Sequence, residues 1–269
     1  MVALALVMAA CSSTPAEPEL VGIRASTDTA VGDERFLFAV SQIDGKRRGS
    51  PDETITLVAT SLDAPDIQIT TEAEFVWVVP DAFGLYRADV PFDRPGLWEI
   101  DFAISTGETS APFLVDVLAA PSTVAAGDAA PLIATPTSGD TPIVDLTTDP
   151  DPMPSLYEMS LDEAFTNGRQ SVVIFATPAY CTSASCGPLL LQTKDAAGTF
   201  DDVNFIHVEV YSGFNEEGFQ PDVDHLVPAV EAFRLPSEPW IFVIDDNGLV
   251  KSRLEGVLGE GELEEAINS

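Results

Sequence analysis

The stretch that most constrains this chain is residues 171–188, an apolar run followed by two cysteines, with the sequence SVVIFATPAYCTSASCGP. Its first six residues are mostly β-branched and apolar, which is typical of a central strand covered on both faces. The Gly-Pro pair and three leucines that follow indicate a helix, because proline is well tolerated in a first helical turn. Cys181 and Cys186 are thus predicted at a strand-to-helix corner, where helix-terminal N–H groups favour a thiolate.

The remainder of the second half alternates between helix and strand signals. Ser160 and Glu163 form a capping-box pattern at the start of a helix predicted to end before Gly168. The sequence Asp-Asp-Asn-Gly at 245–248 is a strong hairpin turn. After the leading helix we expect the order β-α-β-α-β-β-α, with strands at 171–176, 204–210, 240–244 and 249–254 and helices to about 197, near 227–233 and at the C-terminus.

These residues resemble the thioredoxin superfamily, and most closely the exported and membrane-anchored thioredoxin-like proteins of bacteria. The resemblance is carried by Phe-Ala at 175–176, Ala-Tyr-Cys at 179–181, Cys-Gly-Pro at 186–188 and Glu-Pro-Trp at 238–240. It covers residues 153–269 and not the first half. It implies an α/β thioredoxin fold, in which helices cover both faces of a mixed central sheet.

The resemblance also assigns roles to single residues. Cys181, which follows the aromatic Tyr180, would be the attacking thiol, and Cys186 would be the resolving thiol. Pro239 would be the cis-proline opposite the cysteines. The acid that assists the resolving thiol in the family is replaced here by an isoleucine, and Glu238 is the candidate substitute. The implied activity is thiol–disulfide exchange with protein thiols and disulfides, without a cofactor.

The spacing of the cysteines departs from the family, in which two residues rather than four separate them. If 181–186 were helical, the two Cα atoms would lie ~8.6 Å apart, beyond the ~7 Å that a disulfide allows. A bridge therefore requires a non-helical loop. A second registration places Cys186 on the family's first cysteine, with Leu189 where the second one would be.

Three other functions remain open at this point. The pair can be a structural disulfide in a non-catalytic binding module, since a fold does not establish a function. A peroxiredoxin-like peroxidase fits less well, because such enzymes carry a threonine three residues before the reactive cysteine, where this chain has Pro178. A copper chaperone would need a suitably placed histidine, and neither His207 nor His225 suits. We predict no metal site.

The first half reads as an all-β sandwich domain over residues 21–118. Short runs with alternating apolar residues are separated by turn signals, as in a two-sheet sandwich. The region 84–100 is similar to immunoglobulin-like modules of exported bacterial proteins. Trp77 and Trp98 are expected in the core. The predicted strands are 35–40, 54–59, 73–79, 85–90, 97–103 and 112–117.

Residues 119–152 contain six prolines among small and polar residues, a composition typical of a linker. Two apolar pairs, at 132–133 and 143–144, leave open a second interpretation, in which the segment is an ordered strap across the protein.

The N-terminus resembles the end of a bacterial lipoprotein signal. An apolar run ends in two alanines and Cys11, and a polar, proline-containing tether follows to residue 20. The run is too short to span a bilayer, which takes ~20 apolar residues. We expect lipidation at Cys11 and an extracytoplasmic, membrane-anchored protein, with a secreted protein as the alternative. Lipidation would leave one cysteine pair for redox chemistry.

The formal net charge of −32 disfavours binding to nucleic acid or to anionic lipid headgroups. Such a surface promotes solubility. The sequence does not define an oligomeric state.

Overall fold

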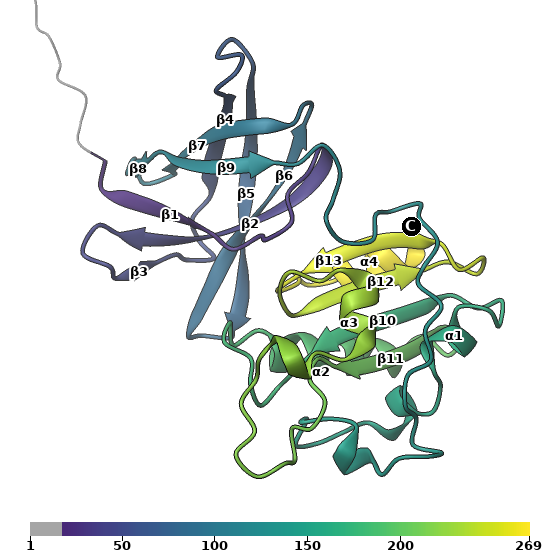
Figure 1. Ribbon diagram of the computed structural model, residues 1–269. Coiled ribbons are helices and arrows are strands. Elements are labelled where there is room, and N and C mark those ends of the chain that lie inside the picture. The colour runs from purple at the N-terminus through teal and green to yellow at the C-terminus, as the bar shows by residue number, and fades with distance from the viewer. Residues whose placement is uncertain (1–17) are drawn as a thin grey trace, which may run out of the picture.

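A computed structural model describes residues 18–269, which fold into two units that lie side by side (Figure 1). The N-terminal unit is built from strands, and the C-terminal unit combines a smaller sheet with short helices. Within residues 18–269, no helix has the length and apolar character needed to cross a membrane. The predicted signal and the lipidation site at Cys11 lie outside the described residues.

The strands of the N-terminal unit form one continuous hydrogen-bonded sheet and not two separate sheets. Its order is β8-β1-β2-β6-β5-β4-β7-β9, with β3 attached to β2. The ends of this path, β8 and β9, are neighbours in the chain, so the sheet curls until it is nearly closed. The strands are β1 (Leu20–Arg24), β2 (Gly32–Gln42), β3 (Arg47–Arg48), β4 (Ile55–Ser61), β5 (Gln68–Val79), β6 (Phe83–Phe92), β7 (Gly96–Ile104), β8 (Ser110–Ala111) and β9 (Phe113–Val117).

The inside of this curled sheet is an aromatic core. Buried and exposed side chains alternate along β4, β6 and β7, as expected for strands with one face in the core. Trp98 is fully buried there, as predicted, and its ring packs edge-on against Phe92. Trp77 lies on the other face of β5 and is 38% exposed, so its expected place in the core is wrong.

The C-terminal unit contains a four-stranded sheet of order β11-β10-β12-β13. Strand β10 runs parallel to β11 and antiparallel to β12, and β12 and β13 form the predicted hairpin. Helices α1 and α3 contribute to the hydrophobic core on one face, and α2 and α4 to the core on the other. The elements are α1 (Leu161–Ala164), β10 (Ser171–Ala176), α2 (Cys186–Ala197), β11 (Asn204–Glu209), α3 (Pro228–Phe233), β12 (Trp240–Ile244), β13 (Val250–Glu255) and α4 (Glu262–Asn268).

Residues 119–152 lie along the C-terminal unit as an ordered strap. Val124 and Leu146 are buried in its two cores. The strap also bonds to the hairpin, where Gly127 N–H donates to the carbonyl of Val250 at 2.8 Å. The segment is therefore joined to the sheet by both apolar contacts and backbone hydrogen bonds.

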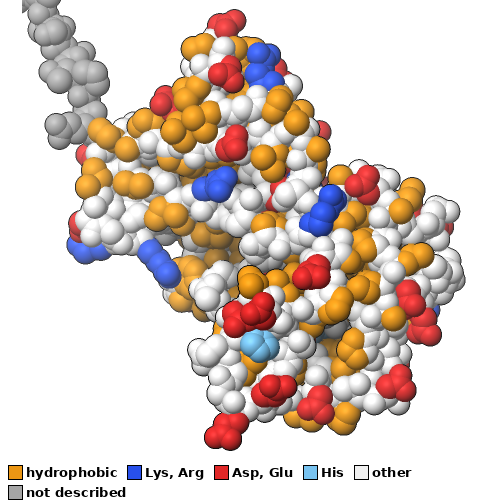
Figure 2. Space-filling view, in the orientation of Figure 1, with side chains coloured by type: hydrophobic (Ala, Val, Ile, Leu, Met, Phe, Trp, Pro, Cys, Tyr) orange, Lys and Arg blue, Asp and Glu red, His pale blue; other side chains and the backbone are white. Residues whose placement is uncertain are grey.

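Ion pairs join the two units. The guanidinium of Arg253, on β13, donates to Asp28 at 2.8 Å and to Glu34 at 2.7 Å. Arg35, on β2, pairs with Glu262 and donates to the carbonyl of Glu255 at 2.8 Å. A small apolar cluster beside these pairs contains Leu37, Val76, Val78 and Val257. A recess with hydrophobic side chains in it remains between the units (Figure 2).

These observations correct the fold class expected from the sequence, an α/β thioredoxin fold preceded by a two-sheet sandwich. The described chain has more strand than helix, with one nearly closed sheet and a second, smaller sheet. Its helices are few and short, and the longest, α2, has 12 residues. The two expected sheets are joined into one because β5 pairs with β4 over residues 68–73 and with β6 over residues 73–79.

Candidate functional site

A disulfide between Cys181 and Cys186 lies where β10 leads into α2. Strand β10 is buried along its whole length, whereas the loop that follows is exposed at residues 182–184 and returns to the core at Ser185 and Cys186. Cys186 is the first residue of α2 and is fully buried. Cys181 is half-buried and is the sulfur nearer to solvent. The two cysteines thus differ in accessibility, although they share one bond.

The loop between the cysteines is not helical, as the spacing requires. The Cα atoms lie 6.0 Å apart, within the range for a disulfide. Ala184 adopts the left-handed conformation, with φ of 61°, which reverses the chain between the two cysteines. A side chain in this conformation costs about 1–2 kcal/mol, so the loop is held by its surroundings against a local preference.

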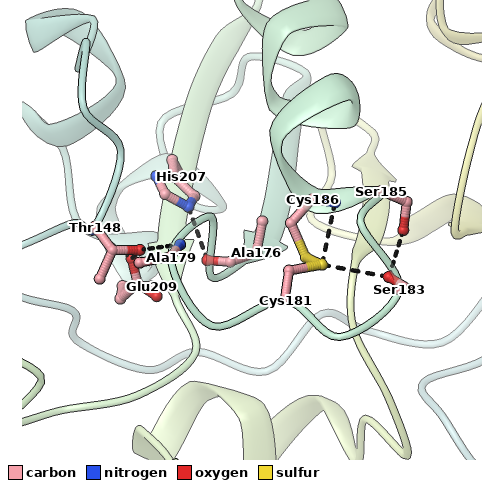
Figure 3. The surroundings of a disulfide bond; sticks show 9 residues. All are labelled: Thr148, Ala176, Ala179, Cys181, Ser183, Ser185, Cys186, His207 and Glu209. Atoms are coloured by element: carbon pink, nitrogen blue, oxygen red, sulfur yellow. Dashed lines mark hydrogen bonds between the residues drawn. A yellow bond between two sulfur atoms is a disulfide. The ribbon is translucent and has the colours of Figure 1, made fainter. Parts of the chain in front are cut away.

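Hydrogen-bond donors surround the Cys181 sulfur (Figure 3). The backbone N–H of Cys186 donates to Cys181 Sγ at 3.2 Å. The hydroxyl of Ser183 lies 3.3 Å from the same sulfur and 2.6 Å from the hydroxyl of Ser185. Because these groups and the start of α2 favour negative charge, the site can stabilise a thiolate at Cys181 once the bridge opens.

Tyr180 anchors the loop and does not point to the sulfurs. Its hydroxyl donates to the carbonyl of Phe214 at 3.3 Å, and its ring packs edge-on against Phe219. A second anchor comes from the strap, where the Thr148 hydroxyl accepts from Ala179 N–H at 3.1 Å (Figure 3). The strap and the segment after β11 therefore both position the cysteine loop.

The peptide bond between Glu238 and Pro239 is cis, as expected from the sequence. Pro239 is buried, and Glu238 is half-buried beside the cleft that the cysteine loop also lines. Burial and the nearby Glu209 carboxylate raise the pKa of Glu238 to about 7, although the Thr177 N–H donates to it. This carboxyl is therefore partly protonated near neutral pH.

Glu209, at the end of β11, is the second buried carboxylate in this region. It accepts hydrogen bonds from the N–H and the hydroxyl of Thr148 at 2.7 and 2.9 Å. Burial raises the pKa of Glu209. One carboxylate oxygen of Glu209 and one of Glu238 have no hydrogen-bond partner within residues 18–269.

His207 is buried on the same strand and is neutral. Its Nε2 donates to the carbonyl of Ala176 at 3.0 Å, and its Nδ1 accepts from the Tyr157 hydroxyl at 2.8 Å. Burial lowers the pKa of His207 to about 4. His225 lies elsewhere, paired with Asp222. In the part of the chain that the structure describes, no group of three or more His, Cys, Asp or Glu side chains is arranged to hold a metal ion.

Comparison with known proteins gives few relatives. No family model matches the chain, and no curated protein matches it. Among solved structures, the chain is similar to the Lin-41 filamin domain, with 14% identity and a TM-score of 0.25. That match covers 40% of this chain and 99% of the filamin domain.

These findings contradict the membership in the thioredoxin superfamily that the sequence suggested. No family model supports that membership, and the described chain has more strand than helix. The expectation of a thioredoxin domain with a redox-active centre depended on that membership and is wrong. The disulfide itself is present, and the descriptions of a signal peptide and lipoprotein fall on residues outside the structure.

Three groups at this site were not anticipated from the sequence. In the sequence, Ser183 is one of four residues between the cysteines, and Glu209 lies in a strand that alternates apolar and mixed residues. Thr148 belongs to a segment for which no contact could be predicted. Only Glu209 carried a signal, because it is a charged residue at the end of a strand that pairs in parallel with β10.

Proposed function

We propose that the protein exchanges disulfides with protein thiols through Cys181 and Cys186. The observation that carries the proposal is the environment of Cys181, a half-buried sulfur that accepts the N–H of Cys186 at the start of α2. A purely structural bridge has no need for donors aimed at one of its sulfurs. Rates of exchange rise with the thiolate fraction and with the accessibility of the sulfur, and both favour Cys181.

The exchange is written with the oxidised protein as the starting state. A substrate thiolate attacks Cys181 Sγ and forms a mixed disulfide, while the Cys181–Cys186 bond breaks and its electron pair leaves on Cys186, which takes up a proton. A second substrate thiolate then attacks the substrate sulfur of the mixed disulfide and releases Cys181 as a thiolate. Two electrons pass from the substrate dithiol to the protein, and the reverse sequence reduces a substrate disulfide.

The test is to trap the mixed disulfide. Cys186→Ser removes the resolving thiol, so Cys181 should accumulate glutathione when the protein is treated with oxidised glutathione, as detected by mass spectrometry. The matched variant Cys181→Ser should accumulate little, because Cys186 is fully buried. If glutathione is instead trapped at Cys186 in the Cys181→Ser variant, Cys186 is the attacking thiol and Cys181 the resolving thiol. If neither variant is modified and both lose thermal stability, the bridge is structural and the unit is a binding module.

We further propose that the protein acts outside the cytoplasm, where disulfides persist. The pattern before Cys11 supports an N-terminal lipid anchor. The full-length protein should then enter the detergent phase on partitioning, and Cys11→Ser should remain in the aqueous phase. Equal partitioning of the two proteins would contradict the anchor.

A further inference from the structure

A cleft of about 810 Å³ lies between the two units and is continuous with the disulfide loop. One wall is formed by the loop residues Thr182, Ser183 and Ser185, by the segment around the cis peptide bond, and by residues after β13. The other wall belongs to the N-terminal unit, where the turn between β5 and β6 reaches toward the second unit (Figure 1). Any molecule that approaches Cys181 through the cleft therefore contacts both units.

The walls are mostly apolar. Leu37, Val78 and Phe83 line the cleft from the N-terminal unit, and Val230 and Val257 line it from the C-terminal unit. Hydrophobic side chains are visible in the recess between the units (Figure 2). The ion pairs between Arg253, Asp28 and Glu34 hold the two walls together. The cleft is therefore a fixed feature with an apolar lining.

The cationic side chain of Arg47 is among the residues that line the cleft. Arg47 is exposed, and its guanidinium lies 4.3 Å above the centre of the Phe83 ring. This guanidinium takes part in none of the ion pairs found among residues 18–269. Its N–H groups are therefore free to bind carbonyl or carboxylate oxygens of a molecule that lies across Phe83.

The cysteine loop lines the cleft through Thr182, Ser183 and Ser185, and exchange at its disulfide requires a thiol. A productive ligand of the cleft must therefore carry a thiol. A small thiol needs only an accessible sulfur, whereas this cleft is within the range of about 300–1,000 Å³ that binds ligands of drug size. That space suits a short extended peptide. We propose that the cleft binds a polypeptide segment whose cysteine is flanked by apolar side chains, so that the N-terminal unit selects the protein substrates of Cys181. This inference rests on the proposed exchange and adds its substrate class.

The test compares three thiols with the oxidised full-length protein. Two are eight-residue peptides with a central cysteine, one flanked by leucine and valine and the other by serine and glycine, and the third is dithiothreitol. We expect the apolar peptide to react about tenfold faster than the polar one. Phe83→Ser should remove this advantage and leave the rates with the polar peptide and with dithiothreitol unchanged. Leu114→Ser, an exposed leucine on β9 outside the cleft, is the matched control and should change none of the rates.

A second variant avoids any effect on folding. Arg47→Gln alters only an exposed side chain and should slow the apolar peptide severalfold, with no effect on dithiothreitol. Equal rates for the two peptides, or a Phe83→Ser effect that extends to dithiothreitol, would overturn the cleft as a substrate site while leaving exchange intact. A disulfide inert to all three thiols would overturn the exchange itself, and the substrate site with it.

Discussion

Two buried groups of charged side chains in this protein are arranged in opposite ways. At the interface between the units, the carboxylates of Asp28 and Glu34 both bond to Arg253, and hydrogen bonds from Thr123 and Ser122 outweigh burial and lower the pKa of Asp28. Behind the disulfide, by contrast, no arginine or lysine pairs with the buried carboxylates of the described residues Glu209 and Glu238. The first arrangement pairs each carboxylate with a cation and joins the two units. The second leaves Glu238, whose pKa is about 7, and Glu209, whose pKa burial raises, near the only disulfide of the described residues.

The largest effect should come from breaking the paired group. Arg253→Met leaves Asp28 and Glu34 buried without a cation, which typically costs about 3–5 kcal/mol. We expect a loss of this size in the free energy of unfolding, measured by urea denaturation. The control is Arg94→Met, which removes an exposed pair with Asp93 and should cause no measurable loss. Equal effects of the two variants would show that the interface contributes little to stability.

His207 gives the next largest effect. Its pKa is about 4 in the folded protein and about 6.5 when exposed, so the unfolded chain binds more protons between these values. Stability should therefore rise with pH from 4 to 6.5, by about 2–3 kcal/mol from this residue. In His207→Gln, which cannot titrate, that part of the rise should disappear from urea unfolding curves recorded across this range. If stability rises equally steeply with pH in both proteins, the pKa of His207 is not lowered in the folded protein.

Glu238 should change the stability with pH in the opposite direction to His207 and by a smaller amount. Its folded pKa of about 7 exceeds the value of 4.5 for an exposed glutamate, so here the folded protein binds more protons. Stability should fall as pH rises from 4.5 to 7, by about 1–2 kcal/mol once solvent screening of this half-buried group is allowed for. The difference between the protein and Glu238→Gln, measured as unfolding free energy, should grow over this interval. If the difference in unfolding free energy does not change with pH, the pKa of Glu238 is not raised in the folded protein.

The smallest effect concerns the backbone of the cysteine loop. Ala184→Gly removes the side chain that disfavours the left-handed conformation, but it also adds freedom to the unfolded chain. The net result should be a stabilisation of about 0.5–1 kcal/mol in the oxidised protein, seen as a higher melting temperature. The gain should be absent after reduction, which frees the loop. A gain that is equal in both redox states would indicate that the loop keeps its conformation without the bridge.

The local parts of the site could be predicted from the sequence. The strand at 171–176 follows from its β-branched composition, and the non-helical loop follows from the helical geometry that six residues would impose. The six predicted strands of the first half overlap β2, β4, β5, β6, β7 and β9. Strands β3 and β8 have two residues each, too few to show a period, and β1 was missed as well. The residues that resemble the thioredoxin superfamily are these same local patterns, and no family model or curated protein matches the chain.

The sequence by itself determined where strands and helix starts occur and that two cysteines meet at a strand-to-helix corner, because these depend on short-range periodicity and turn chemistry. Only the tertiary structure decided that one curled sheet forms, that the strap reaches Glu209 through Thr148, and that a cleft opens beside Cys181. The raised pKa of Glu238 was likewise decided by the tertiary structure, because it depends on burial and on the nearby Glu209. These properties depend on contacts between residues far apart in the chain, such as Arg253 and Asp28, 225 positions apart, and on the water that such contacts exclude.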